Sequence, residues 1–186
     1  GGMNLITGRS AGGMSGDIVL STGVGVDGSG GNVNILVGTG DDSDGGHVLL
    51  SAGRTTAQAQ TGGDVSILGG EGSNTQLNDG GDGGDVTVKG GGAKGLNVND
   101  NAGDVMVSGG DAYAGYGGNV QIFSGGGVST SSGSILVRTT NAGIAGVSGS
   151  VVLRTGTTSI GDSGRISIVT GQANSGSAGS MRLSVG

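Results

Sequence analysis

The 186-residue sequence has no cysteine, no proline and no tryptophan, and these absences exclude several classes of protein. Without cysteine there is neither a disulfide framework nor a thiolate metal site. Without proline the chain is neither a collagen nor a polyproline rod. No apolar run approaches the ~18 residues of a membrane-spanning helix, so we expect no membrane insertion.

Residue types that carry catalysis are equally scarce. His47 is the single histidine and Glu71 the single glutamate. One histidine without cysteine makes neither a zinc site nor a catalytic triad, so we expect a structural role for His47, no cofactor and no enzymatic activity. The net charge is −6 and the only aromatic residues are Tyr113, Tyr116 and Phe123, so we expect no nucleic-acid partner.

Glycine is abundant, and the 49 glycines follow a repeat. The pattern is clearest in residues 62–70, where two glycines precede a polar residue, then an apolar–any–apolar triplet, then small residues ending on glycine. It occurs twelve times, and the second glycine is position one of each repeat. The position-one residues are Gly1, Gly16, Gly31, Gly46, Gly63, Gly84, Gly103, Gly118, Gly133, Gly149, Gly164 and Gly179. A period of about 15 residues over the whole chain predicts a repeat architecture.

Apolar side chains occupy positions three and five of every repeat, as in Val65 and Ile67. Apolar residues two apart, most of them β-branched at position three, predict a strand with one buried face. Position seven carries a small residue in most repeats, such as Thr22, Ala52 or Ser124, so this face is expected to end in a small side chain.

The second half of each repeat, such as residues 24–30, consists mainly of glycine, serine, asparagine and aspartate. These residues either reach positive φ at little cost or bond their own backbone, so the segment is expected to turn. The extra residues of the fourth to sixth repeats fall in these turns, as in residues 75–80. Insertions in turns, with strands of constant length, are typical of a solenoid.

The fold predicted from this pattern is an all-β, parallel β-solenoid of twelve ~15-residue repeats. One repeat per coil would form a single sheet, whereas two repeats per coil would form two parallel sheets packed face to face. We favour two, because outward position six alternates between apolar and polar over the first six repeats and position four has nearly the opposite phase, so that odd and even repeats have different outer faces. Arg138 and Arg154 give further support, because they belong to successive repeats and would stack ~4.8 Å apart in a one-repeat coil. Residues 1–186 are expected to be a single repeat domain, a fragment or ordered core of a longer chain.

Calcium is the best small-ligand candidate. Residues 80–87 match half of the calcium-binding nonapeptide G-G-x-G-x-D-x-U-x, although Thr87 replaces the large aliphatic residue. The weak candidate ligands are Asp79, Asp82 and Asp85, with Asp41, Asp42 and Asp44 as a second set, because carboxylates and carbonyls bind hard cations. Aspartates in glycine-rich turns more commonly serve to form the turn.

Parts of the pattern also bear on two other binding functions. The inserted loops 71–83 and 92–102, or Tyr113 and Tyr116, which lie together in one loop, predict a surface for glycans, since aromatic rings stack on sugars. Ice binding is less favoured, because it requires an outward array of threonines. The threonine column falls on the inward phase of the predicted strands, at Thr7, Thr22, Thr139, Thr155 and Thr170.

The cadence G-G-x-V-x-I-x-x-G-x-G, as in residues 31–35, 149–153 and 164–168, resembles the tandem glycine-rich repeats of virus and phage fibres and of secreted surface proteins of microalgae and bacteria. This resemblance covers the whole chain. It implies an exported, non-enzymatic, structural or adhesive part, located outside the cell or on the surface of a cell or virion.

Apolar residues on the outward phase predict assembly with other copies of the chain. They are Ile6, Leu36, Leu68, Phe123, Leu136 and Val169. Residues 1–132 hold 13 acidic and 4 basic side chains, whereas residues 133–186 hold 1 acidic and 4 basic ones. Opposite charges in the two parts favour head-to-tail contact. The expected function is therefore a structural module of an extracellular filament, fibre or appendage, with a glycan-binding adhesin as the alternative.

Overall fold

The structure is a computed structural model that describes residues 1–185. Within this range it contains no helix and no strand. Extended segments alternate with tight bends, and one bend falls in the loop after each of the first eleven repeats. The bends lie at residues 11–13, 26–28, 41–43, 57–59, 77–79, 97–99, 113–115, 128–130, 144–145, 159–161 and 174–176. The glycine-rich halves of the repeats therefore turn, as the sequence predicts.

Each loop is closed at its base by a contact that we call the neck. A neck is formed by positions seven and eight of one repeat and the glycine at position one of the next. The N–H of Gly133 donates to the carbonyl of Gly125 at 2.9 Å, and the N–H of Gly118 donates to the carbonyl of Gly110 at 2.9 Å. The same bond closes the necks Gly53–Gly63, Gly70–Gly84 and Gly91–Gly103. Loops of different lengths are thus closed in the same way, so the insertions do not disturb the extended segments.

Glycine at position one suits the closeness of the two limbs at the tightest necks. A Cβ on Gly46 would lie 2.7 Å from Cγ1 of Val37, and a Cβ on Gly118 would lie 3.0 Å from the nitrogen of Gly110. In the necks with threonine at position seven, a Cβ on Gly31 would lie 3.2 Å from Cβ of Thr22. The small residues at position seven therefore belong to the neck. The sequence pattern instead predicts that they end a buried face.

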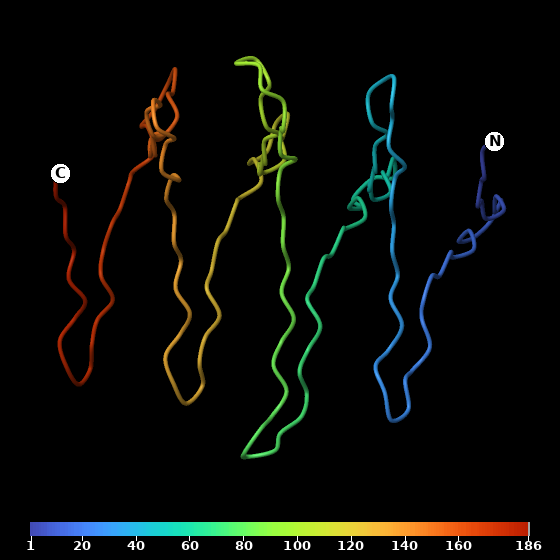
Figure 1. Cartoon of the computed structure of the whole chain (residues 1–186), viewed down its shortest axis with the longest axis horizontal. Coiled ribbons are helices and arrows are strands. Elements are labelled where there is room, and N and C mark those ends of the chain that lie inside the picture. Colours follow the sequence, from blue (N-terminus) through green and yellow to red (C-terminus); the bar gives the residue numbers. More distant parts are fainter. Residues whose placement is uncertain (186) are drawn as a thin grey trace. The chain divides into compact units, whose positions relative to one another are not determined.

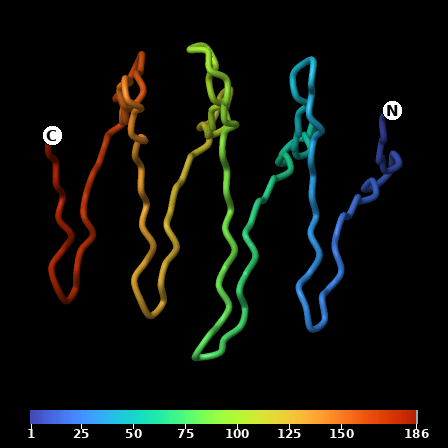
Figure 2. Tube along the Cα trace, viewed as in Figure 1, coloured from blue at the N-terminus to red at the C-terminus, as the bar shows by residue number. Residues whose placement is uncertain are grey.

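Two extended segments leave each neck. Figure 1 shows the chain entering the bend at residues 26–28 and returning, so that segments 16–22 and 31–37 run in opposite directions. The tube in Figure 2 shows the same reversal at residues 125–132, between segments 118–124 and 133–139. Asp27, in the first of these bends, has a φ of 57°, the left-handed conformation that aspartate tolerates better than most residues.

The predicted all-β parallel solenoid, with two face-to-face sheets, is wrong for this structure. The described residues form only eight main-chain hydrogen bonds outside regular elements, all in loops and necks, against roughly one bond per residue in a globular protein. Consecutive segments are held at one end only, so no ladder forms between them in this part of the chain. The sequence pattern identified the extended segments correctly, but it did not supply their hydrogen-bonding partners.

The predicted core is also absent. No residue of 1–185 is buried. Val65 is 56% exposed and Ile67 is 68% exposed, although both were predicted to face a dry interior. The alternation survives in a weaker form, because the outward Leu68 is 82% exposed. In most segments the side that carries positions three and five is thus the less exposed one, but no second layer of described residues covers it.

The chain divides into two compact units, Gly1–Gly103 and Asp104–Gly186. Both units carry the same repeat, the same necks and the same exposed segments. The Gly91–Gly103 neck lies in the first unit, and the neck between Gly110 and Gly118 lies in the second.

The first prediction concerns loop closure, and it compares two adjacent glycines of loop 125–132. A Cβ on Gly127 would meet the carbonyl oxygens of Ser131 at 2.5 Å and Thr130 at 2.8 Å, whereas a Cβ on Gly126 would meet nothing within 4 Å. Gly127→Ala should therefore destabilise loop closure by about 1–3 kcal/mol, the usual range for overpacking.

The measurement is amide exchange of Gly133, whose N–H closes this neck. A loss of about 1.4 kcal/mol speeds exchange roughly tenfold. Gly126→Ala is the matched control and should leave the exchange rate unchanged. Equal rates in the two variants would contradict the described loop.

Candidate functional site

Asp79, Asp82 and Asp85, the first set of aspartates proposed for calcium, lie in or beside loop 70–83, whereas Asp41, Asp42 and Asp44 lie in or beside the bend at residues 41–43. The tip of loop 70–83 is ordered by its own main chain and by Asn74, whose side-chain Oδ1 accepts from the N–H of Gln76 at 2.9 Å and whose carbonyl accepts from the N–H of Gly81 at 3.1 Å. No group of three histidine, aspartate or glutamate side chains able to hold a metal comes together in residues 1–185. The calcium sites at Asp79, Asp82, Asp85 and at Asp41, Asp42, Asp44 remain predictions from the sequence.

Loop 91–102 is the most strongly bonded of the inserted loops. The N–H of Asn97 donates to Oδ2 of Asp100 at 3.0 Å, and the N–H of Asp100 donates back to the carbonyl of Asn97 at 3.0 Å. The N–H of Asn99 donates to Oδ1 of Asn97, also at 3.0 Å. These side chains stabilise a turn, which is the common use of asparagine and aspartate in such segments. Asp100 is thereby engaged with its own loop.

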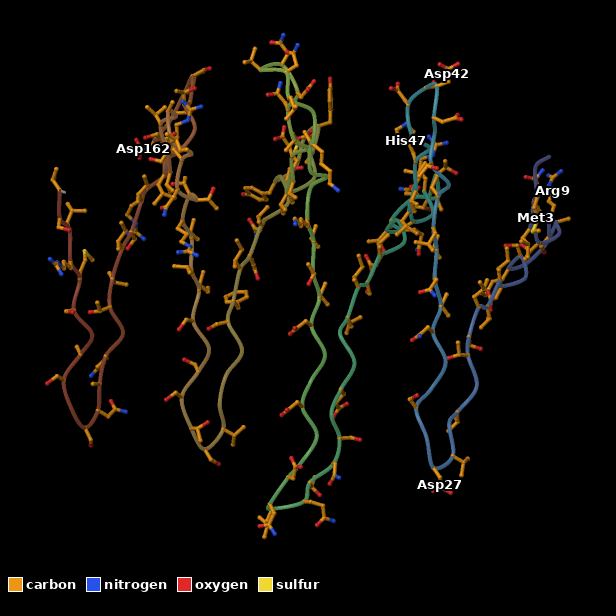
Figure 3. The ribbon with its side chains drawn as sticks, viewed as in Figure 1. Met3, Arg9, Asp27, Asp42, His47 and Asp162 are labelled. Carbon is orange, nitrogen blue, oxygen red and sulfur yellow. The ribbon has the colours of Figure 1, made fainter. Side chains whose placement is uncertain are left out.

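His47 stands at position two of the fourth repeat, and its side chain is exposed. Figure 3 places Asp42 and His47 in the same part of the first unit, and no hydrogen bond or metal-binding group of the described residues joins them. The structural role expected for His47 therefore does not include burial.

The tyrosines proposed for glycan binding are the most accessible aromatic side chains of the chain. Tyr113 is 107% exposed and Tyr116 is 102% exposed, and Tyr113 begins the bend at residues 113–115 in loop 110–117. Phe123, in the extended segment that follows, is 80% exposed. Ring faces of the two tyrosines are therefore open to a ligand, because nothing in the loop covers them.

A hollow next to the neck of the tenth loop is lined by Arg154, Thr155, Gly156 and Thr157. Arg154 is the one charged residue in this lining, and the lining includes no carboxylate, imidazole or thiol. Thr158 donates from Oγ1 to the carbonyl of Ile160 at 3.0 Å, which stabilises the loop rather than the hollow. The hollow follows from the shape of the neck and offers no set of groups for a reaction.

The most extensive candidate site is the exposed apolar surface of the extended segments. It recurs in every repeat, with position three 51–60% exposed in repeats two to twelve and position five 64–74% exposed in repeats one to eleven. Sequence reasoning found these residues but assigned them to the core. In the described part of the chain no helix is both long and apolar enough to cross a bilayer.

No protein-family model, curated protein or solved structure matches this chain.

The second prediction is a calcium titration. Because the structure does not gather the aspartates of loop 70–83, millimolar calcium should leave the thermal transition and the circular dichroism spectrum unchanged. Magnesium at the same concentration is the control for ionic strength. A rise in the transition temperature with calcium alone would show that the carboxylates converge on binding, and Asp82→Asn should then abolish the rise.

Proposed function

We propose that this chain is a structural module of an extracellular filament, fibre or appendage, and that it functions by assembling with copies of itself. The observation that supports the proposal is the amount of surface that one copy leaves in water. The accessible surface is 18942 Å² for a chain of 17.4 kDa. A folded monomer of that mass exposes roughly 7900 Å², and a fully extended chain roughly 25000 Å².

The exposed surface is apolar at positions three and five in every repeat, and in most repeats the outward side of the extended segment also carries an apolar residue. Val19, Leu49 and Met106 are 79%, 86% and 88% exposed on the outward side. Stable proteins bury most of their large apolar side chains. Each Å² of apolar surface removed from water contributes about 25 cal/mol of stabilisation. Contiguous exposed apolar surface marks an interaction site, and a surface repeated along the whole chain suits a polymer better than a single small ligand.

Charge supports contact between unlike parts of neighbouring copies. The acidic residues lie mostly before residue 133, and the basic Arg138, Arg154, Arg165 and Arg182 follow it with only Asp162 as a counter-charge. Complementary patches increase association rates and select orientation. Copies should therefore associate with the acidic part of one beside the basic part of the next.

Location outside the cell or on the surface of a cell or virion is part of the same proposal. It rests on the resemblance of the glycine-rich cadence to fibre and surface proteins, and on the small number of residues suited to catalysis.

The third prediction is that the purified chain forms large assemblies. Sedimentation velocity and light scattering should give a molar mass well above 17.4 kDa that rises with concentration, and electron micrographs should show elongated particles. Raising the salt from about 0.05 to about 1 M should weaken the association, since ionic contacts are screened beyond about 3 Å at the higher concentration. A folded monomer at millimolar concentration would overturn the proposed function.

A second candidate function, attachment to glycans, is favoured by the full exposure of Tyr113 and Tyr116. Because the chain has no tryptophan and two tyrosines, its tyrosine fluorescence reports on this one loop.

The fourth prediction tests that candidate. Binding to chitin or cellulose should change the tyrosine emission, and the Tyr113→Ala/Tyr116→Ala double variant should lose at least tenfold in retention, because stacking on a sugar needs the ring. Leu96→Ala, at an equally exposed apolar residue of another loop, is the control. Equal retention of the double variant and the control would exclude the tyrosines from attachment.

A further inference from the structure

The main chain of the extended segments has no partner within the described residues. In the segment from Gly63 to Gly69, the N–H of Gly63 closes a neck, and no hydrogen bond of residues 1–185 engages the backbone of residues 64–68. The same holds for residues 119–123 and 134–138. An extended backbone with open donors and acceptors along both edges is a template for pairing with another extended chain.

The exposed apolar side chains of these segments would also be covered by another extended chain. Val120 and Ile122 are 51% and 69% exposed on one side, and Phe123 is 80% exposed on the other. A neighbouring segment would satisfy the backbone and cover these side chains together, because extended chains that pair by main-chain bonds lie about 4.7–4.9 Å apart. A partner that covered only the side chains would leave the backbone groups in a dry interface, which costs free energy.

The necks restrict which polypeptide fits beside the segments. Each neck projects a closed loop at a fixed point, and the intervals between position-one glycines are unequal, being longest in the fourth to sixth repeats. A partner must carry extended segments of the same length and must make room for the longer loops 53–62, 70–83 and 91–102. A second copy of this chain carries the same series of segments and loops, so it matches at every repeat.

We propose that extended segments of other copies of this chain lie beside these segments and join them through main-chain hydrogen bonds. The inference rests on the self-assembly proposed above and specifies its contact. The hydrogen bonds form between copies, whereas within one copy the loops and necks fix where each segment begins and ends. Assembly then buries positions three and five, which one copy leaves exposed.

The test is amide hydrogen exchange, followed by mass spectrometry, on the assembled protein separated by size. We expect amides of segments 63–69 and 118–124 to exchange at least about 100-fold more slowly than amides of the bends 77–79 and 128–130. Dilution that dissociates the assembly should remove this protection. Assemblies whose segment amides exchange as fast as the bends would overturn main-chain pairing but leave self-assembly intact. A protein that stays monomeric would overturn both.

A matched pair of variants tests the same contact at one residue. Ser66 is exposed at position four, and its N–H has no partner within the described residues. Ser66→Pro removes that donor and confines Val65 to the extended region, which an extended segment already occupies. Ser66→Ala keeps the donor.

We expect Ser66→Pro to lower the assembled fraction at least tenfold at equal concentration, while Ser66→Ala assembles as the wild type does. Equal assembly of the two variants would contradict main-chain pairing at this segment. The exchange measurement on the wild-type protein is independent of how the proline variant folds.

Discussion

The close approach of two backbones at each neck is the constraint on which the rest of the structure depends. Glycine at position one allows the N–H of one limb to reach the carbonyl of the other, as between Gly133 and Gly125 at 2.9 Å. A side chain would crowd the tightest of these necks, since a Cβ on Gly118 would already meet the nitrogen of Gly110 at 3.0 Å. Where this bond forms, the neck fixes the ends of the two extended segments that meet there, whatever the length of the loop that it closes.

The necks determine where the chain turns, but their hydrogen bonds stabilise it much less than burial of apolar surface stabilises a compact protein. Hydrogen bonds in exposed loops contribute about 0.5–1.5 kcal/mol each. The larger hydrophobic contribution is not realised within one copy, because the apolar residues of each segment remain more than half exposed at positions three and five. A chain of this kind gains stability when a partner covers its segments. This is the physical reason for proposing a fibre component rather than a free-standing domain.

The sequence predicted the positions of the turns, but the strands that it also predicted are absent from the described residues. Glycine spacing located the loops, and the insertion at residues 75–80 contains the bend at 77–79. The alternation of Val65 and Ile67 with outward residues indicated which side of the segment is less exposed. It did not indicate what lies against that side, because the alternation of apolar and polar residues is the same with or without a neighbouring strand.

The sequence also identified candidate calcium ligands without showing whether they come together in space, since that depends on the path of a whole loop. Asp100 illustrates the competing role, because it binds the backbone of its own turn.

The central claim, that one copy cannot bury its own apolar segments, is tested most directly by small-angle X-ray scattering on the protein at the lowest concentration that gives a signal. A compact chain of 186 residues has a radius of gyration of about 16 Å. A single copy that leaves its apolar segments in water should have a value clearly above this and should bind an apolar dye. A single copy with the radius of a compact chain and no dye binding would contradict the claim, because such a chain would have formed a core of its own.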